Sequence, residues 1–327
     1  MLALCAGGCA RSGNEVVVYS SLDQVFSEPI LKDFQHATGI RVRAVYDVEA
    51  TKTTGLVNRL IAEQPHPQAD VFWNSEIART IILKDKGVLT PYTSANASEI
   101  PEHFKDPHGY WAGFAARARI LIYHKELVAE DHLPRSIFEL TSPAWRGKVA
   151  LANPLFGTTS TQVASLSVLL GREKAEQFLR GLKANAVAMV DGNSTSRDMV
   201  AAGEMPIGFT DTDDAHVAIV NGKPVGVIYP DQGEGQIGTL LIPNTVGLIK
   251  GGPHPDNGKR LIDYLLSKET ESKLAFASSA QIPLRDDAQR PPHVPSYRQI
   301  RVMDVDFEQV AHRLNESAAA AQEIFIR

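Results

Sequence analysis

Short apolar runs alternate with helical periodicity through the first ninety residues of the chain. The runs predict strands at residues 16–19, 40–46 and 69–73, and the periodicity predicts helices at residues 28–38, 51–63 and 76–86. Gly39 and Gly87 follow two of these helices, where a C-terminal glycine is favoured. The resulting β-α-β-α-β-α order indicates an α/β fold built on parallel strands.

A second block of the same kind follows residues 88–118, which are rich in proline, glycine and aromatic residues and indicate a boundary. It predicts strands at residues 118–123, 148–151, 187–190 and 206–210, and helices at residues 133–140, 161–170, 174–182 and 197–202. Residues 225–250 add short apolar runs, and residues 255–267 and 269–278 predict surface helices. The chain closes with a polar tail that carries one helical stretch from Phe307.

Loops that follow the predicted strands carry most of the uncharged polar side chains. They hold Ser20, Ser21, Asn74, Ser75, Gly157, Thr158, Thr159, Ser160, Asn193, Ser194 and Thr210. Ligands of open parallel sheets bind at the carboxyl ends of strands, and helix N-termini attract anions. Plain helix capping is the alternative, because these residue types cap helices in any fold. Since the loops come from both blocks, we expect a shared ligand-binding cleft.

Composition, charge and the motifs of the chain restrict the classes of function that we expect for it. The chain has 327 residues, 43% of them apolar and 22% charged, which is typical of a folded globular protein of two domains. A net charge of −5 gives no excess of positive charge that would favour binding to nucleic acid or to an anionic membrane surface. No G-x-S-x-G, H-E-x-x-H or P-loop motif occurs, and Gly233, Gly235 and Gly238, which match G-x-G-x-x-G, indicate only a glycine-rich turn, so we expect no enzyme activity. Asp211-Thr212-Asp213 leaves a phosphatase-like hydrolase as an alternative of another class, although Ala215 departs from that motif.

The N-terminus predicts export. Residues 1–10 read MLALCAGGCA and contain both cysteines of the chain, Cys5 and Cys9. Ala6-Gly7-Gly8-Cys9 resembles the lipobox of bacterial lipoproteins, which implies that residues 1–13 are a signal remnant and linker and that Cys9 is a lipid anchor. The alternative is a frayed terminus with two incidental cysteines. No run of 18 or more apolar residues occurs, so the sequence predicts no membrane-spanning helix.

Several segments in order resemble one known family, the periplasmic solute-binding proteins of bacterial ABC importers, in the branch of the iron(III)-binding proteins. The resemblance spans about residues 14–290 and rests on Val16-Val17-Val18-Tyr19-Ser20-Ser21, Ala69-Asp70-Val71-Phe72-Trp73, Gly157-Thr158-Thr159-Ser160 and Ile207-Gly208-Phe209-Thr210, with Phe34 and residues 37–42, 86–89 and 202–204.

This resemblance implies the type II two-lobed fold, in which each lobe is a mainly parallel sheet flanked by helices, with a cleft between the lobes. We expect residues 14–112 and 230–290 in lobe 1, residues 113–229 in lobe 2, and the tail at 291–327 packed on lobe 1. The family also implies a monomer in the periplasm, or at the outer face of the cytoplasmic membrane, that delivers cargo to ABC permease subunits. A sensory module that presents the same closed form to a receptor remains an alternative.

The resemblance leaves the cargo open. Typical iron(III) members use a His, a Glu and two adjacent Tyr at positions that align here with Asp23, Ser75, Asp213 and Asp214. The replacements, together with Asp211, would gather carboxylates at one cleft, and such a cluster favours a hard cation. We therefore expect an iron(III)-type or divalent metal ion as cargo, with a bound anion at the hydroxyl loops and no required cofactor.

Two alternatives to a metal cargo stay open. A zwitterionic phosphonate or a phosphorylated solute would use the carboxylates for its cation and the hydroxyl loops for its anion, and Trp73 could offer a cation–π face. The acidic run after residue 210 could also be a solvated loop with one capping aspartate.

Overall fold

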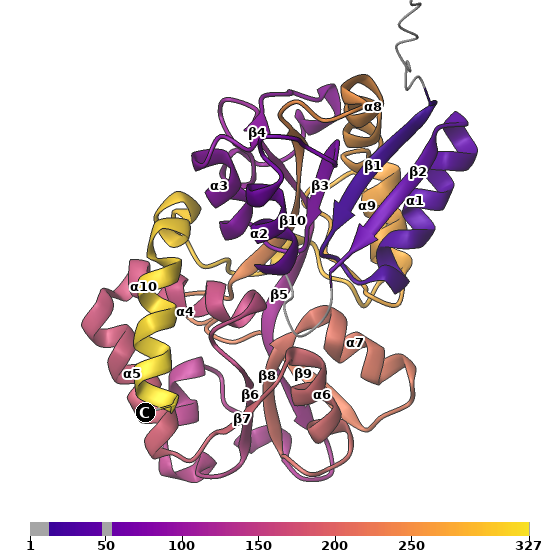
Figure 1. Cartoon of the computed structure of the whole chain (residues 1–327). Helices are drawn as coiled ribbons and strands as arrows, with labels where there is room; N and C mark the ends of the chain where they lie inside the picture. Colours follow the sequence, from indigo (N-terminus) through magenta and orange to yellow (C-terminus); the bar gives the residue numbers. More distant parts are fainter. Residues whose placement is uncertain (1–12, 48–53, 327) are drawn as a thin grey trace, which may run out of the picture.

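Two groups of strands and helices share one long strand, β5 (Ala112–His124), which runs through the middle of the molecule (Figure 1). The computed structural model describes residues 13–47 and 54–326, to which the description below is confined. The first half of β5 pairs with β10, and its second half pairs with β8 and β9. All of its residues are buried, so β5 belongs to the core of both groups.

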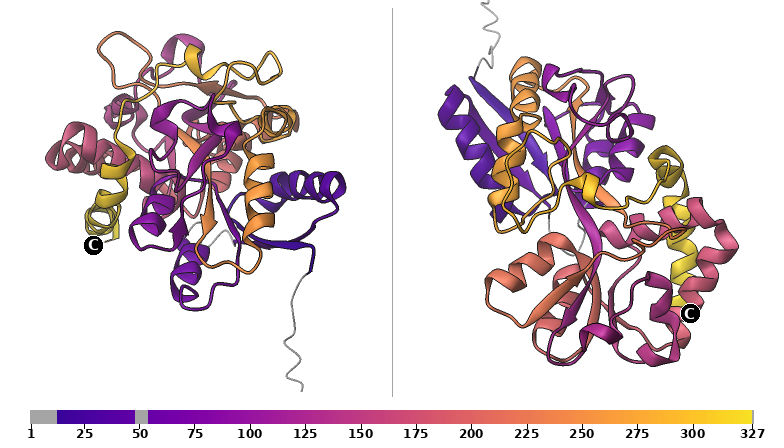
Figure 2. Two further views of the ribbon diagram at one scale, coloured as in Figure 1. Left: turned by 90° about the horizontal axis from the view of Figure 1, so that it is seen from above. Right: turned by 180° about the vertical axis from the view of Figure 1, so that it is seen from behind.

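Lobe 1 is the group that contains the beginning of the described chain. Its strands are β1 (Glu15–Ser20), β2 (Arg41–Tyr46), β3 (Val71–Asn74), β4 (Leu89–Thr90) and β10 (Leu241–Ile249), and its helices are α1 (Gln24–Thr38), α2 (Thr54–Ala62), α3 (Ala78–Asp85), α8 (Pro255–Leu265) and α9 (Lys268–Phe276). Alternate residues of β1 face opposite layers: Val16 and Val18 pack in the cluster that includes α1 and α8, whereas Val17 and Tyr19 pack against α2. Helices therefore cover both faces of this sheet (Figures 1 and 2).

Lobe 2 repeats this layered plan with the middle of the chain. Its strands are β6 (Val149–Ala152), β7 (Ala188–Val190), β8 (Ile207–Asp211) and β9 (Val225–Ile228), and its helices are α4 (Gly157–Leu170), α5 (Arg172–Ala184), α6 (Asn193–Ala201) and α7 (Thr212–Val220). The strand order across both lobes is β2-β1-β3-β10-β5-β8-β6-β7, with β4 beside β10 and β9 beside β5.

Strand direction divides the outer strands from the shared ones. The outer pairs β1–β2, β1–β3, β6–β7 and β6–β8 are parallel, as the apolar runs predict. Strands β5 and β10 run antiparallel to their neighbours in lobe 1, and β5 also runs antiparallel to β8 and β9. The sheet is therefore mixed at its centre, because the chain crosses between the lobes there.

A backbone irregularity marks the crossover. Ala115 has a φ of 42°, which side chains other than glycine rarely adopt, and the register of β10 shifts between Pro243 and Asn244. Glu271, fully buried on α9, accepts a hydrogen bond from the Ala115 N–H at 2.7 Å, and the Asn244 amide donates to the Ala115 carbonyl. These contacts hold β5 in the conformation that leads into Arg117 and Arg119.

The C-terminal helix α10 (Phe307–Ile326) lies mainly against α4 and α5 of lobe 2 and also contacts α3 of lobe 1 (Figure 1). We expected this tail on lobe 1. Its helix buries Val310, Leu314 and Ile324 and contacts α4 and α5 of lobe 2 as well as α3 of lobe 1, so the tail packs on both lobes. In the described part of the chain, neither α10 nor any other helix is long and apolar enough to cross a membrane.

Candidate functional site

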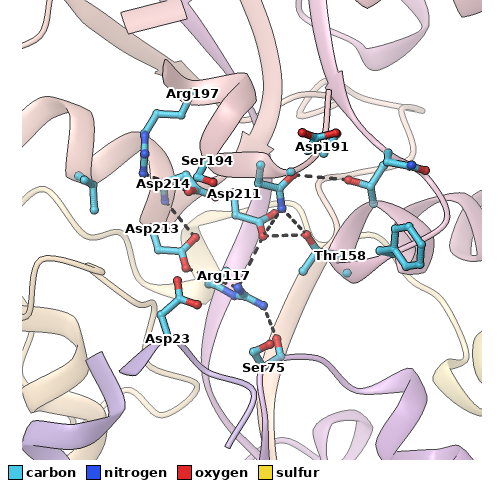
Figure 3. A pocket seen from close by; sticks show the side chains of 18 of the residues that line it. Asp23, Ser75, Arg117, Thr158, Asp191, Ser194, Arg197, Asp211, Asp213 and Asp214 are labelled. Carbon is cyan, nitrogen blue, oxygen red and sulfur yellow. Dashed lines mark hydrogen bonds and ion pairs between the residues drawn. The ribbon is translucent and has the colours of Figure 1, made fainter. Parts of the chain in front are cut away.

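A cavity of about 120 Å³ opens between the lobes, beside the carboxyl ends of their strands. Asp23, just before α1, and Ser75, just after β3, line it from lobe 1, whereas the starts of α4, α6 and α7 line it from lobe 2 (Figure 3). A space of this size suits a ligand of few atoms, since pockets for drug-sized ligands are several times larger.

Carboxylates gather at this cavity from both lobes. Asp211 ends β8, Asp213 and Asp214 stand in the first turn of α7, and Asp23 faces them from lobe 1 (Figure 3). One oxygen from each of Asp211, Asp213 and Asp214 lies within 4.8 Å of the others, a separation that a single metal ion can span. The predicted cluster of four aspartates therefore does converge, although it does not stand alone.

Two arginines of β5, neither of which was predicted as a site residue from the sequence, reach into the same cluster. Arg119 donates to Asp211 Oδ1 at 2.7 Å, and its guanidinium carbon lies 4.5 Å from the centre of the Phe209 ring. Arg117 Nη1 lies 3.4 Å from Asp213 Oδ2 and 3.7 Å from Asp211 Oδ2, while Nη2 donates to the Ser75 carbonyl of lobe 1. Arg117 and Arg119 are two residues apart on one strand, so their side chains project from the same face of β5.

The arginines decide the charge state of the buried acid. Burial alone would raise the pKa of Asp211, but Arg119 and Arg117, with hydrogen bonds from Arg119 and Thr158, hold that pKa below its usual range. Burial works against the charge of Arg117 as well, yet Asp213, Asp211, Asp23 and Asp214 together raise its pKa. Asp211 and Arg117 are therefore both ionised at neutral pH.

Hydroxyl and amide groups close the network around Asp211. Thr158 Oγ1 donates to Asp211 Oδ2 at 2.8 Å, and Asn193 Nδ2 donates to the same oxygen at 3.1 Å. Thr159 Oγ1 accepts from Arg119 Nη2 at 3.1 Å. The hydroxyls of Thr158 and Thr159, which were predicted to meet a ligand, thus take part in the internal ion-pair network at the wall of the cavity.

The helix starts themselves remain available to an anion. The N-cap residues of α4 and α6, Phe156 and Gly192, make no side-chain capping bond. Gly157 and Thr158 of α4 and Ser194 of α6 line the cavity. Two helices without a side-chain cap therefore begin at one cavity, and a helix N-terminus, with its unpaired N–H groups and positive dipole end, is a favourable environment for negative charge.

Comparison with known proteins identifies the family. Residues 80–309 match the family of bacterial extracellular solute-binding proteins. The chain belongs to this family.

Relatives and solved structures agree with that family. Iron uptake protein A1 of Synechocystis sp. is 29% identical over 273 residues, which cover 80% of this chain and 73% of that protein. Iron-bound HitA from Pseudomonas aeruginosa superposes with a TM-score of 0.85 at 22% identity, over 95% of this chain and 99% of that one. The binding protein AfuA from Actinobacillus pleuropneumoniae, with exogenous fructose-6-phosphate bound, gives 0.82 at 22% identity, over 94% and 98%. These superpositions confirm the two-lobed type II fold.

The cavity of this solute-binding protein contains only part of the predicted residue set. Asp23, Ser75, Gly157, Thr158, Thr159, Asn193, Ser194, Asp211, Asp213 and Asp214 line it, whereas Ser20, Ser21, Trp73, Asn74, Ser160 and Thr210 do not. Each residue of the second set is buried, at most 2% exposed. Trp73 packs on Phe114 with ring centres 5.5 Å apart, so it offers no cation–π face to the cleft. Cys9 lies outside the described residues.

Polar contacts explain why the lobe 1 loop residues turn inward. The Ser21 hydroxyl donates to Asn74 Oδ1 at 2.6 Å and accepts from the Ser75 N–H at 2.8 Å. Asn74 Nδ2 donates to Thr80 at 3.0 Å. These side chains join the loops after β1 and β3 to each other and to α3, so they shape the floor of lobe 1 instead of meeting a ligand.

Proposed function

We propose that this solute-binding protein captures a hard metal cation of the iron(III) type, together with a small anion, between its closing lobes. The observation that carries the proposal is the meeting of carboxylates from both lobes beside two uncapped helix N-termini and Arg117. Hard cations prefer oxygen ligands, which Asp23, Asp213 and Asp214 supply. The helix starts and Arg117 supply the complementary partners for an anion.

In the proposed site, Asp211 holds the surrounding side chains in place. Its carboxylate already holds Arg119, Thr158 and Asn193, so it acts as the buried anchor of the cluster, while Asp213 and Asp214 carry the metal contacts. The same engagement argues against the phosphatase alternative, which would need Asp211 as a nucleophile open to substrate. We infer a binding protein without bond chemistry.

The proposed location and partners of the protein follow from its proposed role in solute import. Relatives of this chain carry names that speak of iron uptake and periplasmic iron binding, for example the Synechocystis protein and the Fe(3+)-binding periplasmic protein of Serratia marcescens. We infer a monomer in the periplasm, anchored through Cys9 at the outer face of the cytoplasmic membrane. Its closed form would present the cargo to the membrane subunits of an ABC importer.

A zwitterionic phosphonate or a phosphorylated solute is the second candidate cargo. The observation in its favour is that Arg117 and Arg197 line the same cavity as the aspartates, so opposite charges stand a few ångströms apart. The structure of AfuA holds a sugar phosphate in the same fold. In this arrangement the aspartates would bind the cationic end of the solute, and the helix starts its phosphate.

Thermal unfolding of the metal-free protein distinguishes the two cargoes. We expect iron(III) nitrilotriacetate with bicarbonate, at about a hundredfold excess over Kd, to raise Tm by ~5 °C, because ligand bound only to the folded state stabilises it by mass action. EDTA should reverse the shift. If 2-aminoethylphosphonate or fructose-6-phosphate raises Tm and iron(III) does not, the second candidate replaces the first.

A further inference from the structure

Arg117 lies at the point where the two lobes meet. It comes from β5, the strand that both lobes share, and its side chain is 6% exposed. Its guanidinium contacts the Ser75 carbonyl on lobe 1 and the Asp213 and Asp211 carboxylates on lobe 2. The close-up view shows it between Asp23 and Asp213 on one side and Asp211 on the other (Figure 3). The protein thus places its own cation where carboxylates of both lobes converge.

The charge of Arg117 is permanent. A guanidinium does not lose its proton in proteins, and the surrounding aspartates strengthen that tendency here. A metal ion coordinated by Asp213 would stand only a few ångströms from this charge, in a site partly shielded from water. Repulsion between two cations at such a distance offsets much of the attraction that one carboxylate contributes to metal binding.

Arg117 also has donor capacity to spare. Among the described residues, its Nε has no hydrogen-bond partner although the atom is buried, as is also true of Arg119 Nε, so the difference between the two arginines lies in their ion pairs. Its nearest contacts to Asp213 and Asp211, at 3.4 and 3.7 Å, are longer than the 2.7 Å ion pair of Arg119. Arg117 is therefore held less tightly than its neighbour, and it can exchange its carboxylate partners for an anionic group of a ligand.

We propose that Arg117 determines the charge class of the cargo: it is a tethered cation that excludes a bare metal ion, and it admits a cation only when a negatively charged group enters with it. This inference rests on the proposed function only in assuming that the cargo's cation uses the carboxylates around Arg117. It applies equally to a metal–anion pair and to a zwitterion, and it makes Arg117 a specificity-determining residue.

Arg119 provides the contrast that isolates this role. Its side chain is 1% exposed, it does not line the cavity, and it is fixed by Asp211, Thr158, Thr159 and the Phe209 ring. Removing Arg119 would break the buried network, whereas removing the charge of Arg117 changes what the cavity itself presents. The test therefore uses substitutions at Arg117.

The experiment is a luminescence titration with terbium(III) alone, in a weakly coordinating buffer free of carbonate and phosphate. The full chain is compared with its Arg117→Met and Arg117→Lys variants. Met removes the charge and keeps a long apolar stem, whereas Lys keeps the charge. We expect Arg117→Met to bind terbium(III) about tenfold more tightly or better, and Arg117→Lys to stay within about threefold of the unmodified protein.

Two results would overturn the proposal. One is an Arg117→Met protein that binds terbium(III) no more tightly than the unmodified chain, and the other is an equal gain in Arg117→Lys, which would trace the effect to packing. Circular dichroism checks that each variant folds, and Arg117→Gln takes the place of the Met variant if that one does not. If iron(III) gives no thermal shift in the unmodified protein, that result counts against the proposed cargo. The terbium(III) comparison would still decide whether Arg117 excludes a bare metal ion.

Discussion

Replacing Asp213 and Asp214 together by asparagine is expected to abolish cargo-induced stabilisation of the protein. Both side chains line the cavity from the first turn of α7, and an amide of the same shape cannot neutralise a cation. Each charged contact to a ligand is worth about 1.5–3 kcal/mol, so losing two weakens binding by about a hundredfold or more. The measurement is the ligand-dependent shift in Tm.

The matched control for this pair is Asp256→Asn. Asp256 stands in the first turn of α8, its side chain is 90% exposed, and it is not among the residues that line the cavity. This variant should keep the full shift in Tm. An undiminished shift in the Asp213→Asn, Asp214→Asn double variant would remove these two carboxylates from the binding site.

Asp211→Ala is expected to destabilise the fold itself. The Asp211 carboxylate is 1% exposed and pairs with Arg119 at 2.7 Å, so its removal leaves a buried guanidinium without its counter-ion. Breaking one side of a buried ion pair costs about 3–5 kcal/mol of unfolding free energy. Urea unfolding at neutral pH measures this loss, and the exposed cavity residue Asp191, changed to Asn, provides the control with little expected effect.

The same carboxylate gives this loss a defined pH dependence. Because the pKa of Asp211 is lower in the folded chain than its usual value of about 3.9, its contribution to stability is present above pH ~4 and is lost as the pH falls through the folded pKa. The difference in unfolding free energy between the unmodified protein and Asp211→Asn should therefore shrink below pH ~4. An equal difference at pH 3 and pH 7 would contradict the ion-pair assignment.

The layered α/β architecture was predictable because its elements follow local rules. Apolar runs in buried strands and helical periodicity on their covering helices are both visible in the sequence. The run at residues 69–73 predicts a strand, and β3 occupies Val71–Asn74. The glycine after the first helix, Gly39, takes the left-handed conformation with a φ of 71°, as its position indicates. The family resemblance supplied the two-lobed arrangement, which the solved structures confirm.

The start of β5 was not predictable from pattern alone, and this concealed the arginines of the site. Proline, glycine and aromatic residues made residues 88–118 look like a boundary, yet from Ala112 onward the chain is a buried strand with one left-handed residue, Ala115, held by Glu271. One signal was available. Arg117 and Arg119 are charges at alternate positions of an otherwise apolar strand, and buried arginines require carboxylate partners such as those after β8.

Side-chain direction in the lobe 1 loops was equally hidden from the sequence. Ser21 and Asn74 follow strands whose ends face the cleft, as the prediction required, but they bond to each other inside lobe 1. Thr158 and Thr159 reach the cavity, yet their hydroxyls are engaged by Asp211 and Arg119. Position along a strand predicts which edge of a sheet a residue reaches, whereas its final partner depends on contacts between distant segments.

Native mass spectrometry of the protein with its natural cargo decides whether that cargo is a metal ion. The Cys9→Ser chain would be exported to a bacterial periplasm and purified without added metal, so that a closed form retains its natural cargo. We expect an adduct that contains a metal ion and a small anion and that EDTA removes. An EDTA-resistant organic adduct would contradict the metal cargo and show that the carboxylates and helix starts of the cleft serve a zwitterionic or phosphorylated solute.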